Sequence, residues 1–559
     1  MLQKIIHLLL LLCLITTILL PQSPNDVLAQ TAPDPRFGAI ESFWAANEAA
    51  ELNVGWERIL FYWNEIQPGG PGDWNTLHVL EEWLTGATAN GRTILGLLKN
   101  TPTWATDGEP FAGVPRGLYL PIDDPNNLWA TYTRQVAVYY GPRGVHHWII
   151  WNEPDIAPEV YGHEFSGTVE DYYQLVKVAY QSIKQADPTA TIHLAGLTYW
   201  HDPDYLRRLF AVATADPDAP ANNYFFDVVS LHIYFRSETI ASLVGAAWGA
   251  QSEFGLSKPV WINETNASPN LDPQWPVSRP QFQVDLDQQA WYLIQAFALG
   301  FSSGASRIAV YKLIDIQLPP GGESFGLLRP DFSKRPAFFA YQTLIHYLSG
   351  FSQARQETQP GYFIVTFSRP SGSTRVLWAR GTAVATVRLP AAQDAALVVS
   401  ATGAQYQVVA RDGQYTLSLE GAHCDGECII GGPPIFLVEG ELPPAALPTV
   451  TPGPILPTAT PDPAAILTAT ATLTATITPT ASVTPSPSPT ATPTARPTQT
   501  ATATPFPTVT VTATASAIPT PPPTPPSPAQ RPVGLWFIAA GVGLGILLLL
   551  YSTRKIPRN

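Results

Sequence analysis

The chain contains an apolar run that ends in a carboxylate, His147-Trp148-Ile149-Ile150-Trp151-Asn152-Glu153-Pro154, and the pattern returns in Val260-Trp261-Ile262-Asn263-Glu264. Both runs are short and rich in β-branched and aromatic residues, which predicts buried strands over 147–151 and 259–263. Each strand then delivers a glutamate at its C-terminal end. In parallel α/β barrels, functional side chains gather at these ends, because the loops there vary around a rigid core. The pattern therefore predicts a parallel barrel with two carboxylates at one end.

Residues 30–350 alternate strand-like and helix-like patterns. The eight expected strands are Phe37–Glu41, Arg58–Tyr62, Thr93–Leu98, His147–Trp151, Thr191–Ala195, Val228–Ile233, Val260–Asn263 and Arg307–Tyr311, with amphipathic stretches such as Leu77–Ala89, Val169–Ala186 and Leu286–Leu299 between them. This number of strand–helix units is typical of an α/β fold of the (β/α)8 TIM barrel type. A doubly wound open sheet is the alternative, but no glycine-rich phosphate turn follows the first strand.

Residues 351–440 change to short alternating strands separated by glycine-rich turns, which predicts a small all-β sandwich. The expected strands are Tyr362–Phe367, Thr374–Ala379, Ala385–Leu389, Ala396–Ser400, Tyr406–Ala410, Tyr415–Leu419 and Ile435–Val438. We expect this domain to pack on the barrel as a structural accessory. The alternative, a carbohydrate-binding module, needs an exposed aromatic platform that the sequence does not show.

The two ends of the chain carry patterns typical of export and anchoring. Residues 1–29 combine Lys4, an apolar core and Val27-Leu28-Ala29, which predicts a secretory signal peptide; an uncleaved N-terminal anchor is the alternative. Residues 441–532 are rich in Pro, Thr and Ala, which predicts a disordered stalk. The 19 residues of 533–551 are apolar and precede a basic tail, 552–559, which predicts a transmembrane helix with a cytoplasmic C-terminus. We therefore expect an exported barrel anchored to the cell membrane.

Charge and cysteine usage narrow the partners further. The net charge of −13 argues against nucleic acid, whose recognition needs basic surface. Cys424 and Cys428 remain after signal removal, and in an exported protein their spacing favours a tight disulfide loop over a metal site. No His, Asp or Glu cluster has metal-ligand spacing, so no metal or cofactor is expected. No obligate protein partner is expected either.

From Arg36 to about Val438 the chain resembles clan A glycoside hydrolases, particularly the family 39 and family 5 type of barrel. The resemblance rests on Asn152-Glu153-Pro154 after the fourth strand and Glu264 after the seventh. Alone, the tripeptide is also compatible with a helix-capping turn, because Asn and Pro both favour that position. The second glutamate weakens that alternative. The resemblance implies a glycosidase that hydrolyses O-glycosyl compounds (EC 3.2.1 class).

The resemblance also implies roles for single residues. Glu153 is expected to be the general acid/base and Glu264 the nucleophile, which matches the two carboxylates that glycosidic cleavage needs. Glu264 must stay ionised, and Arg58, expected at the end of the second strand, and Tyr234 are placed to provide charge and a donor. Asn152 is expected to bind the sugar 2-hydroxyl.

Further candidates for substrate binding come from single positions. His232 and Tyr234 alternate along one strand, so both side chains point to the same face; a buried core histidine is the alternative for His232. Trp104 is the best candidate for a sugar-stacking platform. Clan A enzymes commonly show a tryptophan at the eighth strand, where this chain has Tyr311-Lys312. Lys312 either meets an acidic sugar or points outward.

Two functions from different classes are compatible with the sequence. The first is a cell-surface retaining glycoside hydrolase that cleaves β-linked bonds of extracellular carbohydrate, with an oligo- or polysaccharide as substrate. The second is a catalytically inactive carbohydrate-binding protein or adhesin on the same scaffold. The presence of Asn152 and Arg58 beside both glutamates favours the enzyme. The sequence leaves open which sugar is bound and whether chains are cut internally or from an end.

Overall fold

The computed structural model describes residues 32–160, 162–277, 280–316, 322–425 and 427–440. The predicted signal peptide, stalk, transmembrane helix and basic tail lie outside these residues and stay predictions. Among the residues described, no helix combines the length and apolar character needed to cross a membrane.

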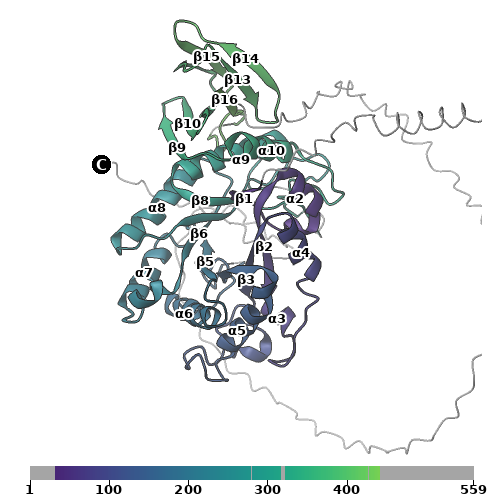
Figure 1. The fold of residues 1–559 in the computed structure, drawn as a ribbon, viewed down its shortest axis with the longest axis vertical. Coiled ribbons are helices and arrows are strands. Elements are labelled where there is room, and N and C mark those ends of the chain that lie inside the picture. The colour runs from purple at the N-terminus through teal and green to yellow at the C-terminus, as the bar shows by residue number, and fades with distance from the viewer. Residues whose placement is uncertain (1–31, 161, 278–279, 317–321, 426, 441–559) are drawn as a thin grey trace, which may run out of the picture. The chain divides into compact units, whose positions relative to one another are not determined.

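Eight parallel strands close into a barrel in chain order, as the sequence predicted (Figure 1). They are β1 (Asp34–Ala39), β2 (Val54–Tyr62), β3 (Thr93–Lys99), β4 (Val145–Ile150), β5 (Thr191–Leu197), β6 (Val228–Tyr234), β7 (Val260–Asn266) and β8 (Ala305–Val310). Pairing of β1 with β8, from Phe37 opposite Ile308 to Ala39 opposite Val310, closes the ring. Because all strands run in the same direction, their C-terminal ends lie at one end of the barrel.

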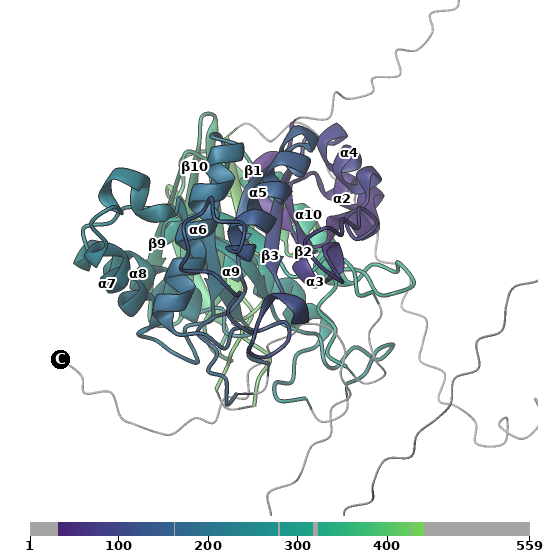
Figure 2. The same ribbon diagram turned by 90° about the horizontal axis from the view of Figure 1, so that it is seen from below.

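Helices surround the barrel and connect its strands (Figure 2). The α-helices are α2 (Ala46–Leu52), α3 (Trp63–Ile66), α4 (Glu81–Ala89), α5 (Leu128–Tyr140), α6 (Val169–Ala186), α7 (Tyr205–Ala215), α8 (Thr239–Glu253), α9 (Leu286–Ser302) and α10 (Pro336–Leu348). The short 3₁₀ helices are η1 (Ser42–Ala45), η2 (Thr103–Ala105), η3 (Gly141–Arg143) and η4 (Pro220–Phe225). Helix α6 has the predicted bounds and starts at a capping box, in which Thr168 and Asp171 satisfy each other's backbone N–H groups.

Helix α9 differs from the other helices because it is buried on all sides. Every residue from Gln288 to Phe301 is buried. The helix contacts β7 and β8 of the barrel and also β9 and β10 of the second domain. The stretch Leu286–Leu299, expected to be an amphipathic helix with one solvent-exposed face, is therefore a helix covered on both faces, which can be apolar all round.

The second domain is antiparallel and follows the barrel directly. Its strands are β9 (Gln353–Thr358), β10 (Tyr362–Arg369), β11 (Gly372–Ala379), β12 (Ala385–Pro390), β13 (Ala395–Ser400), β14 (Gln405–Val409), β15 (Gln414–Leu419) and β16 (Ile435–Gly440). They form a six-stranded sheet in the order β14-β13-β16-β11-β10-β9 and a two-stranded sheet, β12-β15. The sequence missed β9, because this edge strand is polar and has no fully buried residue.

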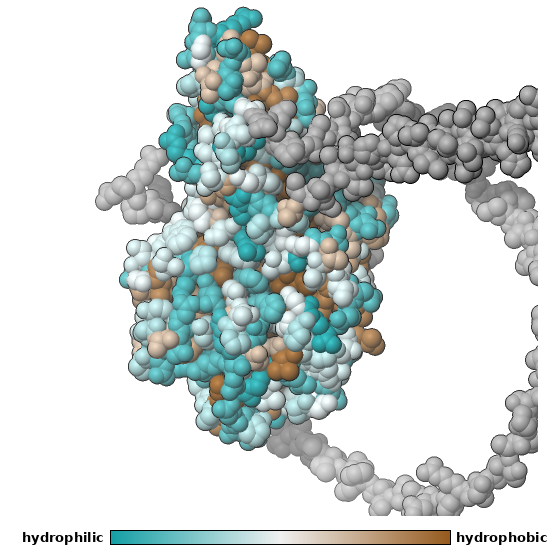
Figure 3. Space-filling model, viewed as in Figure 1, coloured by the Kyte–Doolittle hydropathy of each residue, from teal (hydrophilic) through white to brown (hydrophobic). Residues whose placement is uncertain are grey.

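The surface of the second domain bears on its predicted accessory role. Its exposed large hydrophobic residues are Val384, Tyr406 and Val409, so Tyr406 is the only exposed aromatic among the described residues of this domain. The face seen in Figure 3 is largely hydrophilic over the described residues, with small and scattered apolar patches. A single tyrosine makes a smaller platform than a sugar-binding module uses, which favours the accessory interpretation.

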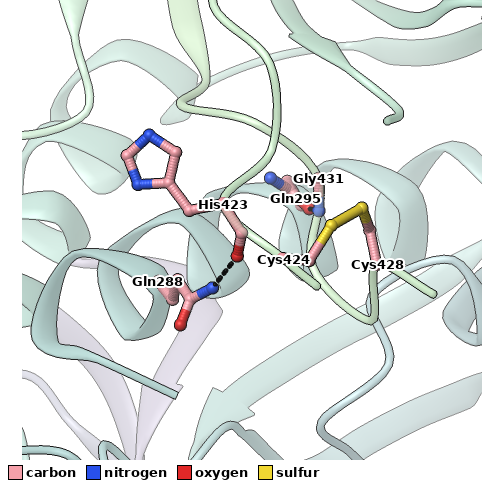
Figure 4. Close-up of a disulfide and its surroundings, with 6 residues drawn as sticks. All are labelled: Gln288, Gln295, His423, Cys424, Cys428 and Gly431. Atoms are coloured by element: carbon pink, nitrogen blue, oxygen red, sulfur yellow. Dashed lines mark hydrogen bonds between the residues drawn. A yellow bond between two sulfur atoms is a disulfide. The ribbon is translucent and has the colours of Figure 1, made fainter. Parts of the chain in front are cut away.

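Buried amide side chains of α9 bind the second domain. Gln295 is fully buried; its Nε2 donates to the Gly432 carbonyl at 3.0 Å, and its Oε1 accepts from the Gly431 N–H at 3.0 Å. At the start of the helix, Gln288 Nε2 donates to the His423 carbonyl at 2.6 Å (Figure 4). These contacts hold the segment before β16 against the barrel.

The expected disulfide lies in the same segment. Cys424 and Cys428 are bonded, with their Cα atoms 5.4 Å apart, inside the usual range of about 4.4–6.8 Å (Figure 4). Next to this loop, Ile429 accepts a hydrogen bond from the Ser237 N–H at 3.2 Å, and the Ser237 hydroxyl donates to Gln295 at 2.8 Å. Because Ser237 follows closely after β6, the second domain is tied to the end of that strand.

Candidate active site

Glu153 lies on a tight loop just after β4. Strand β4 ends at Ile150, and the loop then takes left-handed backbone conformations at Trp151 (φ 70°) and Glu153 (φ 42°). Such conformations are costly for residues other than glycine and persist where surrounding contacts hold them. Here the Trp151 N–H donates to Leu98 at 2.9 Å and the Glu153 N–H donates to Gly196 at 3.2 Å. The ends of β3 and β5 therefore fix the position of Glu153.

Asp155, which the sequence analysis missed, also fixes the position of this loop. One of its oxygens accepts hydrogen bonds from the Thr198 N–H and hydroxyl, both at 2.8 Å, and from the Tyr199 N–H at 2.9 Å. Burial raises the pKa of Asp155 to about 6, against these donors, which lower it. Asp155 follows Glu153 and Pro154 directly, but this sequence alone does not indicate that its carboxylate accepts hydrogen bonds from the residues after β5.

Glu264 lies inside β7 rather than beyond its end. The register between β6 and β7 shifts here, so that Leu231 pairs with Ile262 but His232 pairs with Glu264. Such a bulge re-aims a side chain locally, and it brings Glu264 to the same side as the β6 residues. The sequence analysis ended this strand at Asn263 and expected Glu264 just beyond it, whereas β7 continues to Asn266.

The carboxylate of Glu264 is held by a cation and by hydrogen-bond donors. Arg58 Nη1 lies 2.5 Å from its Oε1, and the Tyr234 hydroxyl donates to its Oε2. His232 Nδ1 lies 3.5 Å from the same Oε2. Burial raises the pKa of Glu264, but the charges of Arg58 and His232 and the Tyr234 hydrogen bond outweigh it, so the pKa is lowered. Arg58 is in the middle of β2, not at its end as expected.

Glu153 has different surroundings and the opposite pKa shift. Its Oε1 forms a 2.6 Å hydrogen bond with His232 Nδ1. Burial raises the pKa of Glu153 to about 7; the His232 hydrogen bond and charge oppose the shift, and the negative charges of Glu264 and Glu164 add to it. At neutral pH this arrangement keeps a proton available on Glu153 while Glu264 stays ionised.

His232 connects the two carboxylates, and a glycine makes room for it. His232 is buried, and its pKa is raised because the charges of Glu264 and Glu153 outweigh its desolvation. A Cβ added to Gly196 on β5 would lie 2.0 Å from His232 Nε2. The ring can occupy this position only because residue 196 has no side chain, so the alternating His232 and Tyr234 both reach the site.

Two further ion pairs lie at the same end of the barrel. Lys312, two residues after β8, donates to Glu41 Oε2 at 2.9 Å. Lys99, the last residue of β3, pairs with Glu164. The alternative in which Lys312 points outward is wrong, because the residue is 7% exposed. The sequence analysis missed Glu41, Lys99 and Glu164, since nothing in their local patterns marks a partner on another loop.

Asn152 and Trp104 lie at the margins of this arrangement. Asn152 is half-buried beside Glu153, and its Oδ1 has no hydrogen-bond partner among the described residues. Trp104 is also half-buried, donates to the Gln67 carbonyl at 2.7 Å and packs edge-on against Trp63. Both roles assigned from the sequence stay predictions.

The fold brings together three possible metal ligands that the sequence spacing did not reveal. Ligand atoms of Glu153, His232 and Glu264 lie within 4.8 Å of one another. A cation at this point would compete with the Arg58 guanidinium, which already lies against Glu264, and with the Tyr234 hydroxyl on the other oxygen. The donor set therefore fits a proton-transferring carboxylate pair better than a divalent ion.

Comparisons with known proteins agree with the fold. No family model matches the sequence, and no curated protein matches it. Solved structures do: a family 39 glycoside hydrolase from Bacteroides cellulosilyticus WH2 is similar with TM-score 0.56 and 16% identity, over 73% of this chain and 82% of that one. A GH30 endoxylanase from Clostridium papyrosolvens C71 is similar with TM-score 0.51 and 13% identity, over 74% of this chain and 98% of that one. The GH30 xylanase C catalytic domain from Talaromyces cellulolyticus is similar with TM-score 0.50 and 13% identity, over 72% of this chain and 96% of that one. The chain thus shares the fold of clan A glycoside hydrolases, including those of family 39.

Proposed function

We propose that this chain is a retaining glycoside hydrolase that cleaves β-linked O-glycosidic bonds of carbohydrate outside the cell. The observation that carries the proposal is the pair formed by Glu153 and Glu264, two buried carboxylates whose pKa values are shifted in opposite directions. One oxygen of Glu153 lies within 4.8 Å of one oxygen of Glu264. Retaining enzymes hold their carboxyl groups about 5–5.5 Å apart, whereas inverting enzymes need roughly 6.5–9.5 Å to admit water. The short separation supports retention.

The two glutamates divide the reaction between them. In the first step the ionised Glu264 attacks the anomeric carbon, while protonated Glu153 gives its proton to the departing oxygen. This step leaves the sugar bonded to Glu264 and Glu153 ionised. In the second step Glu153 takes a proton from water, whose oxygen displaces Glu264 and restores both side chains. In this proposal Asn152, next to Glu153, binds the sugar 2-hydroxyl.

The proposal also includes the cellular location of the enzyme. The sequence patterns of residues 1–29 and 533–551 support an exported enzyme anchored by a C-terminal transmembrane helix. The stalk of residues 441–532 would then separate the barrel from the membrane. Protease digestion of intact cells tests this topology: the barrel should be released, whereas a barrel protected from the protease would refute it.

Hydrolysis of aryl β-glycosides by the purified protein tests the activity. We expect release of the aryl group from at least one glycoside, and NMR should show the β-anomer of the free sugar as first product. A first product in the α-form would refute retention. The double variant Glu153→Gln with Glu264→Gln controls for contaminating glycosidases. Sugar binding without hydrolysis would instead identify the catalytically inactive alternative.

A further inference from the structure

The ion pair of Glu41 and Lys312 lies where the barrel closes, at the seam between β1 and β8. The Ile40 N–H donates to Val310 at 3.0 Å, and the Leu313 N–H donates back to Ile40 at 3.1 Å. Glu41 and Lys312 therefore extend from neighbouring backbone segments just beyond the two strand ends. Both side chains are mostly buried, with 10% of the Glu41 side chain and 9% of the Lys312 side chain exposed.

This pair belongs to the same barrel end as the two catalytic candidates. Tyr311, next to Lys312, packs against Tyr234 with ring centroids 6.0 Å apart, and Tyr234 donates to Glu264. Burial raises the pKa of Tyr311, and the charges of both Glu41 and Glu264 raise it further. The ring contact of Tyr311 with Tyr234, which itself donates to Glu264, places the ion pair beside the site.

The cations around the site are already neutralised by carboxylates. Arg58 pairs with Glu264, Lys99 with Glu164 and Lys312 with Glu41. A positive charge that has its own buried partner attracts an additional anion weakly, because the partner repels that anion. Lys312 in this structure is therefore a poor receptor for a sugar carboxylate, although a lysine at this position first suggested an acidic sugar.

We propose that the Glu41–Lys312 pair is a specificity-determining subsite that binds hydroxyl groups of a neutral sugar unit and rejects a uronic acid. The contact between them uses one of the three N–H donors of Lys312 and one of the two oxygens of Glu41. The remaining donors and acceptor suit hydroxyl groups, each of which both donates and accepts. A uronate would bring a second carboxylate next to Glu41. This inference rests on the proposed glycosidase function.

Matched aryl glycosides test the inference on the full-length protein. The probes are the 4-nitrophenyl β-glycosides of glucose, galactose and xylose, compared with the β-glucuronide. We expect kcat/KM for the best neutral probe to exceed that for the glucuronide by about 100-fold or more, since like charges in a buried site cost several kcal/mol. In Glu41→Gln, Lys312 loses its neutralising partner and can attract the uronate. The ratio of kcat/KM for the neutral probe to kcat/KM for the glucuronide should therefore fall by about tenfold or more.

A matched variant separates this effect from a general change of charge. Glu51→Gln also removes the carboxylate partner of a lysine, Lys334, in an exposed pair. It should leave the ratio of neutral to acidic probe unchanged. If Glu41→Gln does not fold, Lys312→Gln provides the test: the unpaired Glu41 carboxylate should repel the glucuronide more strongly and widen the ratio of neutral to acidic probe.

The outcomes separate the inference from the function on which it rests. A glucuronide cleaved as fast as the neutral probes overturns the inference and leaves the glycosidase function intact. An unchanged ratio in both Glu41→Gln and Lys312→Gln also overturns it. Absence of cleavage of every probe by the wild-type protein overturns the glycosidase function together with the inference.

Discussion

Glu153 and Glu264 are the same residue type at the same end of one barrel, yet their surroundings differ. Glu264 contacts Arg58 and the Tyr234 hydroxyl, and its pKa is lowered although it is buried. Glu153 has His232 on one oxygen, and its other oxygen is buried without a partner among the described residues. Burial then raises its pKa to about 7. Neighbouring charges and donors, more than burial itself, decide which carboxylate holds the proton.

The backbone under the two residues differs as well. Glu264 is part of β7 and is aimed by a bulge, so ladder hydrogen bonds hold it. Glu153 lies on a loop with a left-handed φ of 42° and depends on contacts from neighbouring strands. One side of the site is therefore built into the sheet, and the other is assembled from loop contacts. Substitutions should affect the two sides differently.

Removal of Glu264, the proposed nucleophile, should have the largest effect. In Glu264→Ala no glycosyl-enzyme can form, so kcat/KM should fall by about 10⁴-fold or more on natural and activated substrates alike. Azide can then attack the sugar directly from the vacated side. We expect a glycosyl azide of inverted configuration, identified by NMR. A retained azide from this variant would move the nucleophile to Glu153.

Removal of Glu153, the proposed acid/base, should have a smaller effect that depends on the leaving group. In Glu153→Ala, substrates with poor leaving groups should lose about 10²–10⁴-fold in rate, whereas dinitrophenyl glycosides leave without a proton. On these substrates the covalent intermediate should accumulate, since its hydrolysis needs the base. Azide should restore turnover and give the retained product. Rates on dinitrophenyl glycosides that fall as far as in Glu264→Ala would contradict this role.

The sequence predicted the scaffold and the two glutamates better than it predicted the residues that contact and position them. Alternating patterns predicted eight barrel strands, and Glu153 and Glu264 followed from apolar runs that end in a carboxylate. The pairings of Glu41 with Lys312 and of Lys99 with Glu164 were not predictable, because each joins residues from separate loops whose approach depends on the closed barrel. Local periodicity carries no information about such long-range contacts.

The missed details have physical reasons of the same kind. The bulge that directs Glu264 arises from the register between β6 and β7, which a single strand does not encode. The loop that follows β4, with its left-handed residues, depends on hydrogen bonds to Leu98 and Gly196 on other strands. Strand β9 is stabilised by pairing with β10 rather than by its own side chains. Tertiary pairing overrides local propensity in these places.

Gly196→Ala tests the loop side of the comparison. The new methyl group would overlap His232 and push the ring away from Glu153. Since His232 lowers the pKa of Glu153, its withdrawal should raise that pKa and move the alkaline limb of the kcat/KM profile above about 7. A misplaced acid/base should also lower kcat by about 10²-fold.

A second glycine provides the control for this change. A methyl group at Gly245 in α8 would meet no neighbouring atom within 4 Å, so Gly245→Ala should leave activity and pH profile unchanged. An alkaline limb in Gly196→Ala that stays at the wild-type pH would show that His232 does not set the pKa of Glu153.

Tyr234→Phe tests the sheet side and should have a milder effect. The Tyr234 hydroxyl lowers the pKa of Glu264, which must be ionised to react. Without it this pKa rises, so the acidic limb of kcat/KM should move to higher pH while the alkaline limb stays in place. Arg58 remains in contact, so the loss of rate near neutral pH should be only about tenfold. Tyr119→Phe, which removes an exposed hydroxyl bonded to Asp171 at 2.7 Å, should shift neither limb.

The smallest effect on activity is expected from removal of the disulfide between Cys424 and Cys428. Cys424 and Cys428 lie next to Ile429, which accepts from Ser237 near the end of β6. Buried hydrogen bonds of Gln295 hold this segment independently of the disulfide. Cys424→Ala with Cys428→Ala should therefore cost about 2 kcal/mol of stability, as expected for a short loop, and lower Tm. The kcat/KM value should stay within about twofold, because Tyr234 keeps its position. A shift of the acidic limb as large as in Tyr234→Phe would contradict this and show that the disulfide itself positions the β6 end.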